Sequence, residues 1–300
     1  MLVTMKDILK RASFENYAVA APNISSELDA RAAIEVAEEL NSPLILDVAY
    51  VSTPDLVFFG RYLTDLCRSS CVPIALNLDH GEEFSHAILA IRGGFTSIMV
   101  DRSTLTYEEN VRQVKELVRI AHSVGVTVEA ELGHVGQGTN YYEDRNKALT
   151  DPKQAKQYIE DTGIDCLAVA IGTAHGAYVG KPYLDFERLV DIKKETDNFP
   201  LVLHGGSGTG DENLKKACRL GINKVNVNND LMRGACENIM SSDLSGNNAY
   251  NLWSLAKEGY KRSLKKMIEI CGSMNKAWIP EYTGIQAGQI VMEEMRRENI

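Results

Sequence analysis

The chain has 300 residues, of which 44% are hydrophobic and 24% are charged, a composition typical of a globular protein. This length suffices for one large barrel or for two smaller domains. The formal net charge of -9 argues against a general surface for nucleic acid or anionic membrane, because neither polyanion gains from meeting an acidic protein. We therefore expect no nucleic-acid or membrane partner, and any phosphate must be bound by a local group of residues.

The six cysteines form no CxxC pair, and the chain begins without an apolar signal region. No segment approaches the roughly 18 uncharged apolar residues that a membrane-spanning helix requires. These features predict a reduced, cytoplasmic protein.

Eight short apolar runs rich in Val, Ile and Leu follow one another along the chain, with amphipathic helical stretches between them. The runs cover residues 17–23, 43–49, 73–79, 97–101, 126–132, 166–171, 200–204 and 224–228. This alternation predicts a parallel sheet with crossover helices. Eight nearly even repeats in roughly 230 residues favour the α/β fold class and a closed (β/α)8 TIM barrel over an open doubly wound sheet.

The helical stretches carry end signals, such as the serines and acids that open residues 25–40, and Thr106 and Gly125 at the ends of another stretch. No segment resembles a linker, so we expect a single domain over residues 1–300. Its barrel would cover about 1–245, and a C-terminal helical extension would cover about 246–300, with helices at 251–273 and 285–299. The long polar loop 133–150 is a candidate lid or oligomer contact.

Polar side chains follow the predicted strands at their C-terminal ends, where the chemistry of a TIM barrel takes place. They are Asn23, Asp47, Asp79, His80, Asp101, Glu129, Glu131, His175, His204, Asn226 and Asn228. Three of the six histidines, His80, His175 and His204, are among them. A lone histidine would more often be a hydrogen-bonded or surface residue, but three converging imidazoles are the ligand count of a catalytic zinc.

Asp79 directly precedes His80, so in a regular strand the two side chains would point in opposite directions. One side chain would then face the metal while the other faces a substrate atom. Two roles for Asp79 remain open: a proton donor and acceptor beside the metal, or a carboxylate that orients a histidine ligand.

The loops after the seventh and eighth predicted strands, at 204–217 and 226–235, have the position and composition of a phosphate site. Glycines allow backbone N–H groups to approach an anion, and Ser207 and Asn226 add side-chain donors. A glycine-rich turn is weak evidence alone, but here it adjoins His204.

These residues resemble the class II, zinc-dependent ketose-bisphosphate aldolases, the family of fructose- and tagatose-bisphosphate aldolases. The resemblance runs from about residue 5 to about 275, through "NLDHGEEFSHAILAIRGGFTSIMVDRS", "VEAELGHVG", "TGIDCLAVAIGTAHGAYVGKPYLDFERL" and "PLVLHGGSGTGDENLKKACRLGINKVNVNND". It implies reversible aldol cleavage, in which a zinc ion polarises the ketose carbonyl and Asp79 exchanges the proton of the C4 hydroxyl group.

The resemblance also assigns roles residue by residue. It makes His80, His175 and His204 the zinc ligands, and Asp101 and Glu131 a possible second metal site. It implies a phosphate-binding set of Gly176, Lys181, Gly205, Gly206, Ser207, Asn226, Asn228 and Asn229, with Asn23 as a possible substrate-binding residue. It further suggests a monovalent cation near Gly180 and Lys181, and a homodimer or homotetramer.

A Schiff-base aldolase would instead need a lysine inside the barrel, and the sixth and seventh predicted strands contain none. Lys224 begins the eighth predicted strand, so we expect it to face away from the catalytic end.

Several positions depart from the family pattern, notably Asp47, Ala49, Asn77 and Arg102 together with the loop 133–150. Three hypotheses therefore stand. The chain is a fructose- or tagatose-bisphosphate aldolase, a divergent aldolase for another phosphorylated or acidic ketose, or a catalytically weak paralogue that binds zinc and a sugar phosphate.

Overall fold

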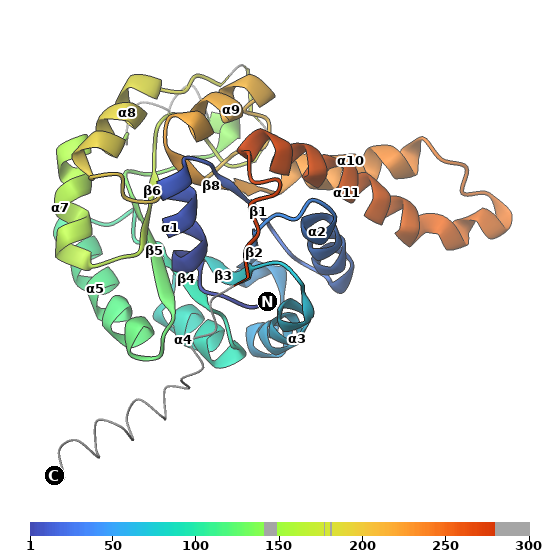
Figure 1. Cartoon of the computed structure of the whole chain (residues 1–300), viewed down its shortest axis with the longest axis horizontal. Helices are drawn as coiled ribbons and strands as arrows, with labels where there is room; N and C mark the ends of the chain where they lie inside the picture. Colours follow the sequence, from blue (N-terminus) through green and yellow to red (C-terminus); the bar gives the residue numbers. More distant parts are fainter. Residues whose placement is uncertain (141–148, 177, 181, 280–300) are drawn as a thin grey trace, which may run out of the picture.

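Eight parallel strands form a single sheet that curls into a nearly closed barrel (Figure 1). The computed structural model describes residues 1–140, 149–176, 178–180 and 182–279. The strands are β1 (Val19–Pro22), β2 (Leu44–Ala49), β3 (Ile74–Gly81), β4 (Ser97–Val100), β5 (Thr127–Leu132), β6 (Cys166–Val169), β7 (Leu201–Leu203) and β8 (Ile222–Val227). Each overlaps one predicted apolar run.

The strands pair in the order β1-β8-β7-β6-β5-β4-β3-β2. The remaining gap between β1 and β2 is bridged where the Ile24 N–H group donates to the Asp47 carbonyl oxygen at 2.7 Å. The predicted TIM barrel is therefore confirmed.

Helices cover the outside of the barrel, one after each of the first seven strands and a further one after β8. They are α2 (Glu27–Glu39), α3 (Leu56–Ser69), α4 (Phe84–Gly93), α5 (Tyr107–Ser123), α7 (Pro152–Thr162), α8 (Phe186–Glu195), α9 (Asp211–Arg219) and α10 (Asn229–Met240). The predicted end signals are confirmed, because Ser26 and Thr106 cap α2 and α5 with side-chain oxygens that accept backbone N–H groups. No described helix is both long and apolar enough to cross a membrane.

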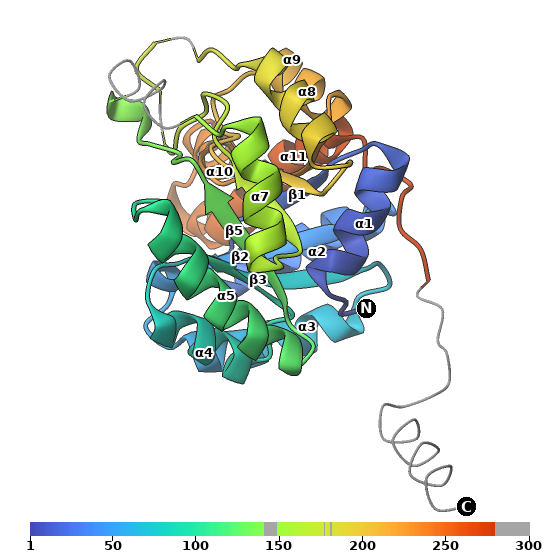
Figure 2. The same cartoon turned by 90° about the vertical axis from the view of Figure 1, so that its left-hand side faces the viewer.

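A helix that the repeat pattern did not predict, α1 (Met5–Glu15), lies across one end of the barrel (Figures 1 and 2). Its buried face carries Met5, Ile8, Leu9 and Ala12, which pack against inward-facing residues of the strands. This cluster closes the end of the barrel opposite the polar strand ends. The larger core lies between the strands and the outer helices.

Helices α10 and α11 (Leu252–Cys271) form an antiparallel arm that projects from the barrel, joined through the short helix η3 (Gly246–Asn251) (Figure 1). The two helices cross closely, since a Cβ atom on Gly259 would lie 2.2 Å from the Gly234 carbonyl oxygen. Helix α11 confirms the helix predicted at 251–273. The helix predicted at 285–299 lies outside the described residues.

Candidate metal and phosphate site

The C-terminal end of β3 carries a local irregularity that shapes the site. The register between β3 and β4 shifts between Leu78 and Gly81, and His80 has a φ of 50°. A positive φ is uncommon for a residue other than glycine, and it breaks the alternation of a regular strand. His80 Nε2 consequently lies 3.9 Å from Asp79 Oδ1. The expected opposite orientation of these two side chains is wrong, because both face the same site.

The three predicted metal ligands lie together, although they come from three different strand ends. The ring centroids are 4.9 Å apart for His80 and His175, 4.7 Å for His80 and His204, and 5.7 Å for His175 and His204. One ring nitrogen of each lies within 4.8 Å of the others. This spacing is short enough for all three imidazoles to coordinate a single metal ion.

Two of the imidazoles contact carboxylates. His80 Nδ1 lies 2.8 Å from Asp101 Oδ2, and His204 Nε2 lies 2.8 Å from Glu129 Oε1. These contacts occupy one ring nitrogen of each imidazole, and the opposite nitrogens, His80 Nε2 and His204 Nδ1, are the ones that would bind a metal. His204 Nδ1 accepts from Asn226 Nδ2 at 3.3 Å, a contact that a metal ion would replace. His80 Nε2 is buried and has no hydrogen-bond partner among the described residues, which is the state expected of a metal ligand. The donor set therefore fits a zinc ion.

The surroundings of the imidazoles shift their pKa values in different directions. Burial, followed by the neighbouring His204 and His80, lowers the pKa of His175 to about 3, so this ring is neutral, as a ligand must be. Burial also acts to lower the pKa of His80, but the charge of Asp79 and the hydrogen bond with Asp101 outweigh it and raise that pKa to about 10. A metal ion at this position would displace the His80 proton.

Asp79 is held by two amide groups. Asn23 Nδ2 donates to Asp79 Oδ2 at 2.7 Å, and Asn226 Nδ2 donates to Asp79 Oδ1 at 3.1 Å. Burial acts to raise the pKa of Asp79, but the adjacent His80 and His204 outweigh it and lower the pKa to about 2. The side chain is therefore an ionised base at neutral pH, fixed in one orientation.

A pocket of about 260 Å³ joins the histidines to the glycine-rich loop. Its lining includes Asn23, Asp79, His175, Gly176, His204, Gly205, Gly206, Ser207, Asn226, Asn228 and Asn229. The structure thus brings together the predicted phosphate-binding residues, except Lys181, which lies outside the described residues. Helix α10 begins at Asn229, so its N-terminus opens onto this pocket and favours an anion.

The loop geometry depends on close backbone contacts. Gly205 has a φ of 68°, and a Cβ atom there would lie 2.2 Å from the Ala174 carbonyl oxygen. Ser207 Oγ accepts from the backbone N–H groups of Asn228 and Asp230, both at 3.2 Å. The Ser207 hydroxyl hydrogen consequently remains available to a ligand oxygen.

The possible second metal site is also assembled. His80, Asp101 and Glu131 each offer a ligand atom within 4.8 Å of the others. Glu131 Oε2 is buried without a hydrogen-bond partner among the described residues. Burial, followed by the charge of Asp101, raises the pKa of Glu131 to about 8. Since His80 belongs to both clusters, a metal ion at either position would draw on the same imidazole.

The expectation for Lys224 is wrong. It is the third residue of β8, which begins at Ile222, and its side chain is fully buried inside the barrel. Lys224 Nζ lies 2.8 Å from Glu129 Oε2 and 3.1 Å from Asp47 Oδ2. Despite burial, these carboxylates raise its pKa, so Lys224 is held as an ammonium group. A Schiff-base lysine needs the opposite shift, which excludes Lys224 from that role.

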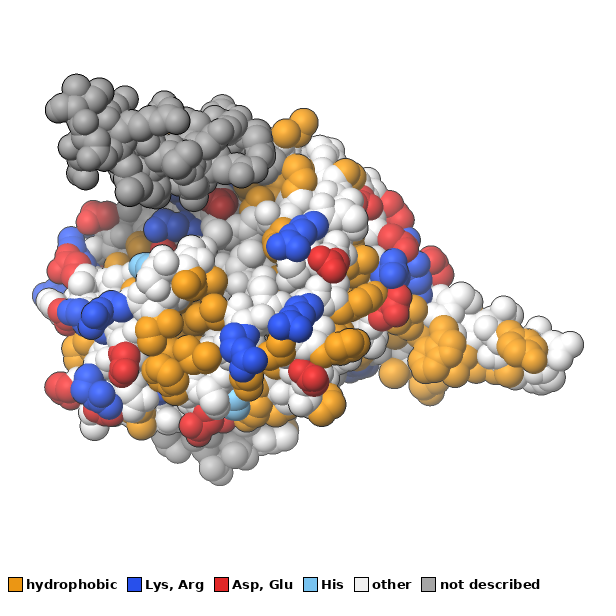
Figure 3. All heavy atoms as spheres, turned by 90° about the horizontal axis from the view of Figure 1, so that it is seen from below, with side chains coloured by type: hydrophobic (Ala, Val, Ile, Leu, Met, Phe, Trp, Pro, Cys, Tyr) orange, Lys and Arg blue, Asp and Glu red, His pale blue; other side chains and the backbone are white. Residues whose placement is uncertain are grey.

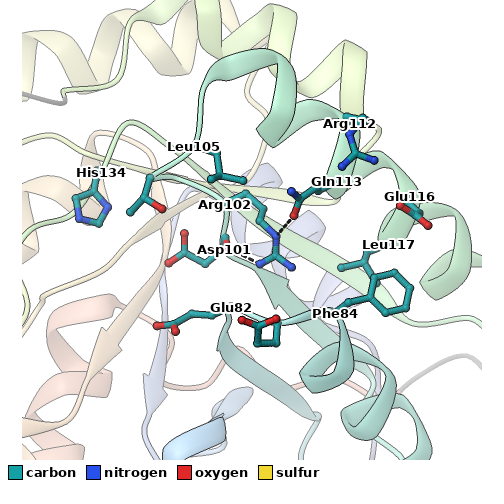
Figure 4. Close-up of a pocket in the computed structure, with 12 residues that line it drawn as sticks. Glu82, Phe84, Asp101, Arg102, Leu105, Arg112, Gln113, Glu116, Leu117 and His134 are labelled. Carbon is teal, nitrogen blue, oxygen red and sulfur yellow. Dashed lines mark hydrogen bonds between the residues drawn. The ribbon is translucent and has the colours of Figure 1, made fainter.

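A larger cavity of about 690 Å³ lies beside Asp101, between the strand ends and helices α4 and α5 (Figure 4). Arg102 crosses it, with Nε donating to Gln113 Oε1 at 2.6 Å and Nη1 donating to the Gly81 carbonyl oxygen at 3.0 Å. Glu82, His134 and other polar residues of both charges also line it. Arg102 thus points towards α5, which carries Gln113.

The polar strand ends at one end of a TIM barrel define a barrel enzyme with a candidate metal centre. The family model for class II fructose-bisphosphate aldolase matches residues 3–276. A fructose-bisphosphate aldolase from Thermus caldophilus is 38% identical over 310 residues, which cover 92% of this chain and 100% of that protein.

Two solved structures are similar over most of their length. The YdjI aldolase from Escherichia coli K12 superposes with a TM-score of 0.83 at 32% identity, covering 93% of this chain and 100% of that one. A putative fructose-1,6-bisphosphate aldolase from Coccidioides immitis gives a TM-score of 0.81 at 28% identity, covering 91% and 97%. The chain therefore belongs to the class II fructose-bisphosphate aldolase family and is a carbon–carbon lyase.

Proposed function

We propose that the protein catalyses the reversible, zinc-dependent cleavage of fructose 1,6- or tagatose 1,6-bisphosphate to dihydroxyacetone phosphate and glyceraldehyde 3-phosphate. The observation that carries this proposal is the pocket in which Asp79, two of the three histidines and the glycine-rich loop meet. A ketose phosphate has a carbonyl group, hydroxyl groups and a phosphate at matching positions along one short chain.

The roles of the side chains follow from their positions. A zinc ion held by His80, His175 and His204 would supply a Lewis acid for the ketose carbonyl. Gly206, Ser207 and the N-terminus of α10 would bind the phosphate of the dihydroxyacetone half. Asp79 would accept the proton of the C4 hydroxyl group during cleavage and return it during condensation, while Asn23 and Asn226 keep its carboxylate in place.

The test is the release of dihydroxyacetone phosphate from a panel of ketose phosphates by purified, zinc-loaded protein. We expect cleavage of at least one of the two bisphosphates, and its loss in Asp79→Ala. Stoichiometric zinc and phosphate binding without turnover of any panel member would instead indicate the weakly active paralogue. Cleavage at a near-wild-type rate in Asp79→Ala would remove Asp79 from the proposed role.

A second candidate, cleavage of a different phosphorylated or acidic ketose, is favoured by the cavity of about 690 Å³ beside Asp101, which is separate from the pocket at the glycine-rich loop and shares no lining residue with it. Its lining of arginine, glutamine and carboxylate side chains offers both donors and acceptors for hydroxyl groups. A condensation assay with dihydroxyacetone phosphate and aldehydes of increasing length tests it. Preference for a longer aldehyde over glyceraldehyde 3-phosphate would support this candidate.

We also propose that the protein is a homodimer or homotetramer. The arm of α10 and α11 extends beyond the barrel and carries hydrophobic side chains on its surface (Figures 1 and 3). Met240, Tyr250 and Trp253 are 84%, 88% and 68% exposed. The roles proposed for loop 133–150 and for a monovalent cation near Lys181 remain predictions, because residues 141–148 and Lys181 lie outside the described residues; the cytoplasmic location remains a prediction too.

A further inference from the structure

The interior of the barrel beneath the three histidines contains charged side chains that the reaction itself does not use. Asp47, Glu129 and Lys224 are all 0% exposed, and so is the neighbouring His204, a proposed metal ligand. Charged groups are almost never fully buried unless they are paired, because they lose their hydration. A hydrophobic barrel interior would fold without them, so their presence points to a task at the adjoining site.

The contacts form one continuous chain from the barrel core to a candidate ligand. Lys224 Nζ donates to Glu129 Oε2 at 2.8 Å, and the second oxygen of the same carboxylate, Oε1, lies 2.8 Å from His204 Nε2. Each oxygen of Glu129 therefore has its own partner. The lysine fixes the carboxylate from below, and the carboxylate contacts the imidazole from the other side.

Asp47 approaches the same lysine differently. Its Oδ2 lies 3.1 Å from Lys224 Nζ without an aligned hydrogen bond, and its Oδ1 accepts from Asn77 Nδ2 at 2.8 Å. Within the described residues, Asp47 does not contact His204. The lysine thus has two carboxylate neighbours, of which only Glu129 contacts a candidate metal ligand within the described part of the chain.

The Glu129 contact selects the tautomer of His204. A neutral imidazole carries its proton on one nitrogen, and the contact with a carboxylate requires that nitrogen to be Nε2. Nδ1 then keeps its lone pair, which in this structure accepts from Asn226 Nδ2 at 3.3 Å, on the side where the same amide donates to Asp79 Oδ1. This is the side that opens onto the candidate metal site.

We propose that Glu129 and Lys224 are positioning residues, which hold the His204 ring with Nδ1 available to the metal ion. The inference rests on the proposed function, since it takes His204 as a ligand. Asp47 contributes to the packing around Lys224 but is not required for metal affinity. The pair Glu129→Gln and Asp47→Asn is therefore a matched test, because each replaces one acidic side chain beside the same lysine with its amide.

The experiment measures the zinc dissociation constant of the metal-stripped, full-length protein by competition with a chromogenic chelator. We expect Glu129→Gln to weaken zinc binding by about 10- to 100-fold, the usual effect of losing a carboxylate that orients a histidine ligand. Asp47→Asn should bind zinc almost as the wild type does. With Co²⁺ as a probe, the visible absorption bands should change in Glu129→Gln and stay the same in Asp47→Asn.

Glu129→Gln leaves Lys224 with one carboxylate neighbour, so it carries a risk of misfolding. The double variant Glu129→Gln/Lys224→Gln removes both charges and should fold, with the same loss of zinc affinity. Wild-type affinity in a folded Glu129→Gln or double variant would overturn the inference, and so would an equal loss in Asp47→Asn. Absence of zinc binding in the wild type would overturn the proposed function itself, a distinguishable result.

Discussion

Asp79 owes its ionised state and its fixed orientation to its neighbours. Two amide donors and two imidazoles surround the carboxylate, and the resulting pKa of about 2 keeps it ionised throughout the physiological range. Because this carboxylate stays ionised and oriented, no fraction of the protein has its base protonated and inactive at physiological pH.

We predict that Asp79→Asn lowers kcat for aldol cleavage by about 10²- to 10⁴-fold, because the amide cannot accept the hydroxyl proton. The zinc content should not change, because the proposed metal ligands are the three clustered histidines and do not include Asp79. Steady-state kinetics with parallel metal analysis checks both. Loss of zinc together with activity would show that Asp79 acts on the metal centre rather than on the substrate.

Asp47 makes a prediction about the pH dependence of stability. Burial is the largest effect on its pKa, which rises to about 8 from an ordinary value of 3.8. Between these values the native state holds a proton that the unfolded state has lost, so stability falls as pH rises through this window. The slope due to Asp47 is at most about 1.4 kcal/mol per pH unit.

Asp47→Asn removes this titration while it keeps an oxygen that can accept from Asn77. Urea unfolding at pH 5, 6, 7 and 8 with chelator present should show the free energy of unfolding declining more steeply in the wild type than in the variant. If the free energy of unfolding declined equally steeply with pH in both proteins, this would contradict the raised pKa of Asp47.

At the scale of elements, the phosphate loop depends on a backbone approach between β7 and the segment after β6. Gly205→Ala must place a methyl group against the Ala174 carbonyl oxygen at a positive φ. We expect it to destabilise the protein by about 1–3 kcal/mol more than Gly125→Ala does, as overpacking adds to the conformational cost. Thermal or urea unfolding measures the difference.

Gly125 is the matched control, because it has a φ of 75° and a Cβ atom added there would meet no atom within 4 Å among the described residues. Its replacement incurs only the conformational cost. Equal losses in the two variants would mean that the loop after β7 yields to the added methyl group, and that the close approach does not determine its shape.

The elements differ in how far the sequence could predict them. The eight strands were predictable because buried parallel strands are continuous apolar runs, and their number and even spacing favoured a closed barrel over an open sheet. Helix α1 precedes the first repeat, so the alternation gave no place for it. The positive φ of His80 could not be predicted, because tertiary contacts rather than the local sequence stabilise that conformation.

The site was predictable to the level of residue type and strand end. The sequence places His80, His175 and His204 at the correct edge, since all parallel strands end on the same side. It does not show which partner each side chain selects. Lys224 looked like the first residue of its strand, but β8 begins two residues earlier, and the inward face shared by Lys224 and Asn226 follows from that register.

For the whole molecule, the arm of α10 and α11 gives a prediction about assembly. Tyr250→Ser combined with Trp253→Ser should reduce the mass measured by light scattering, because it removes exposed aromatic area from the proposed contact between subunits. Phe14→Ser is the control, since Phe14 is 87% exposed on α1, at the end of the barrel. An unchanged mass in the arm variant would exclude the arm as the contact.

The proposed chemistry of the whole protein depends on one zinc ion at His80, His175 and His204. The most direct measurement follows dihydroxyacetone phosphate release from fructose 1,6- and tagatose 1,6-bisphosphate as metal-stripped protein is titrated with zinc. We predict no cleavage in chelator and a rise in activity that saturates at about one zinc per chain. Cleavage that is insensitive to the chelator, from protein containing well under one zinc per chain, would contradict the zinc-dependent mechanism.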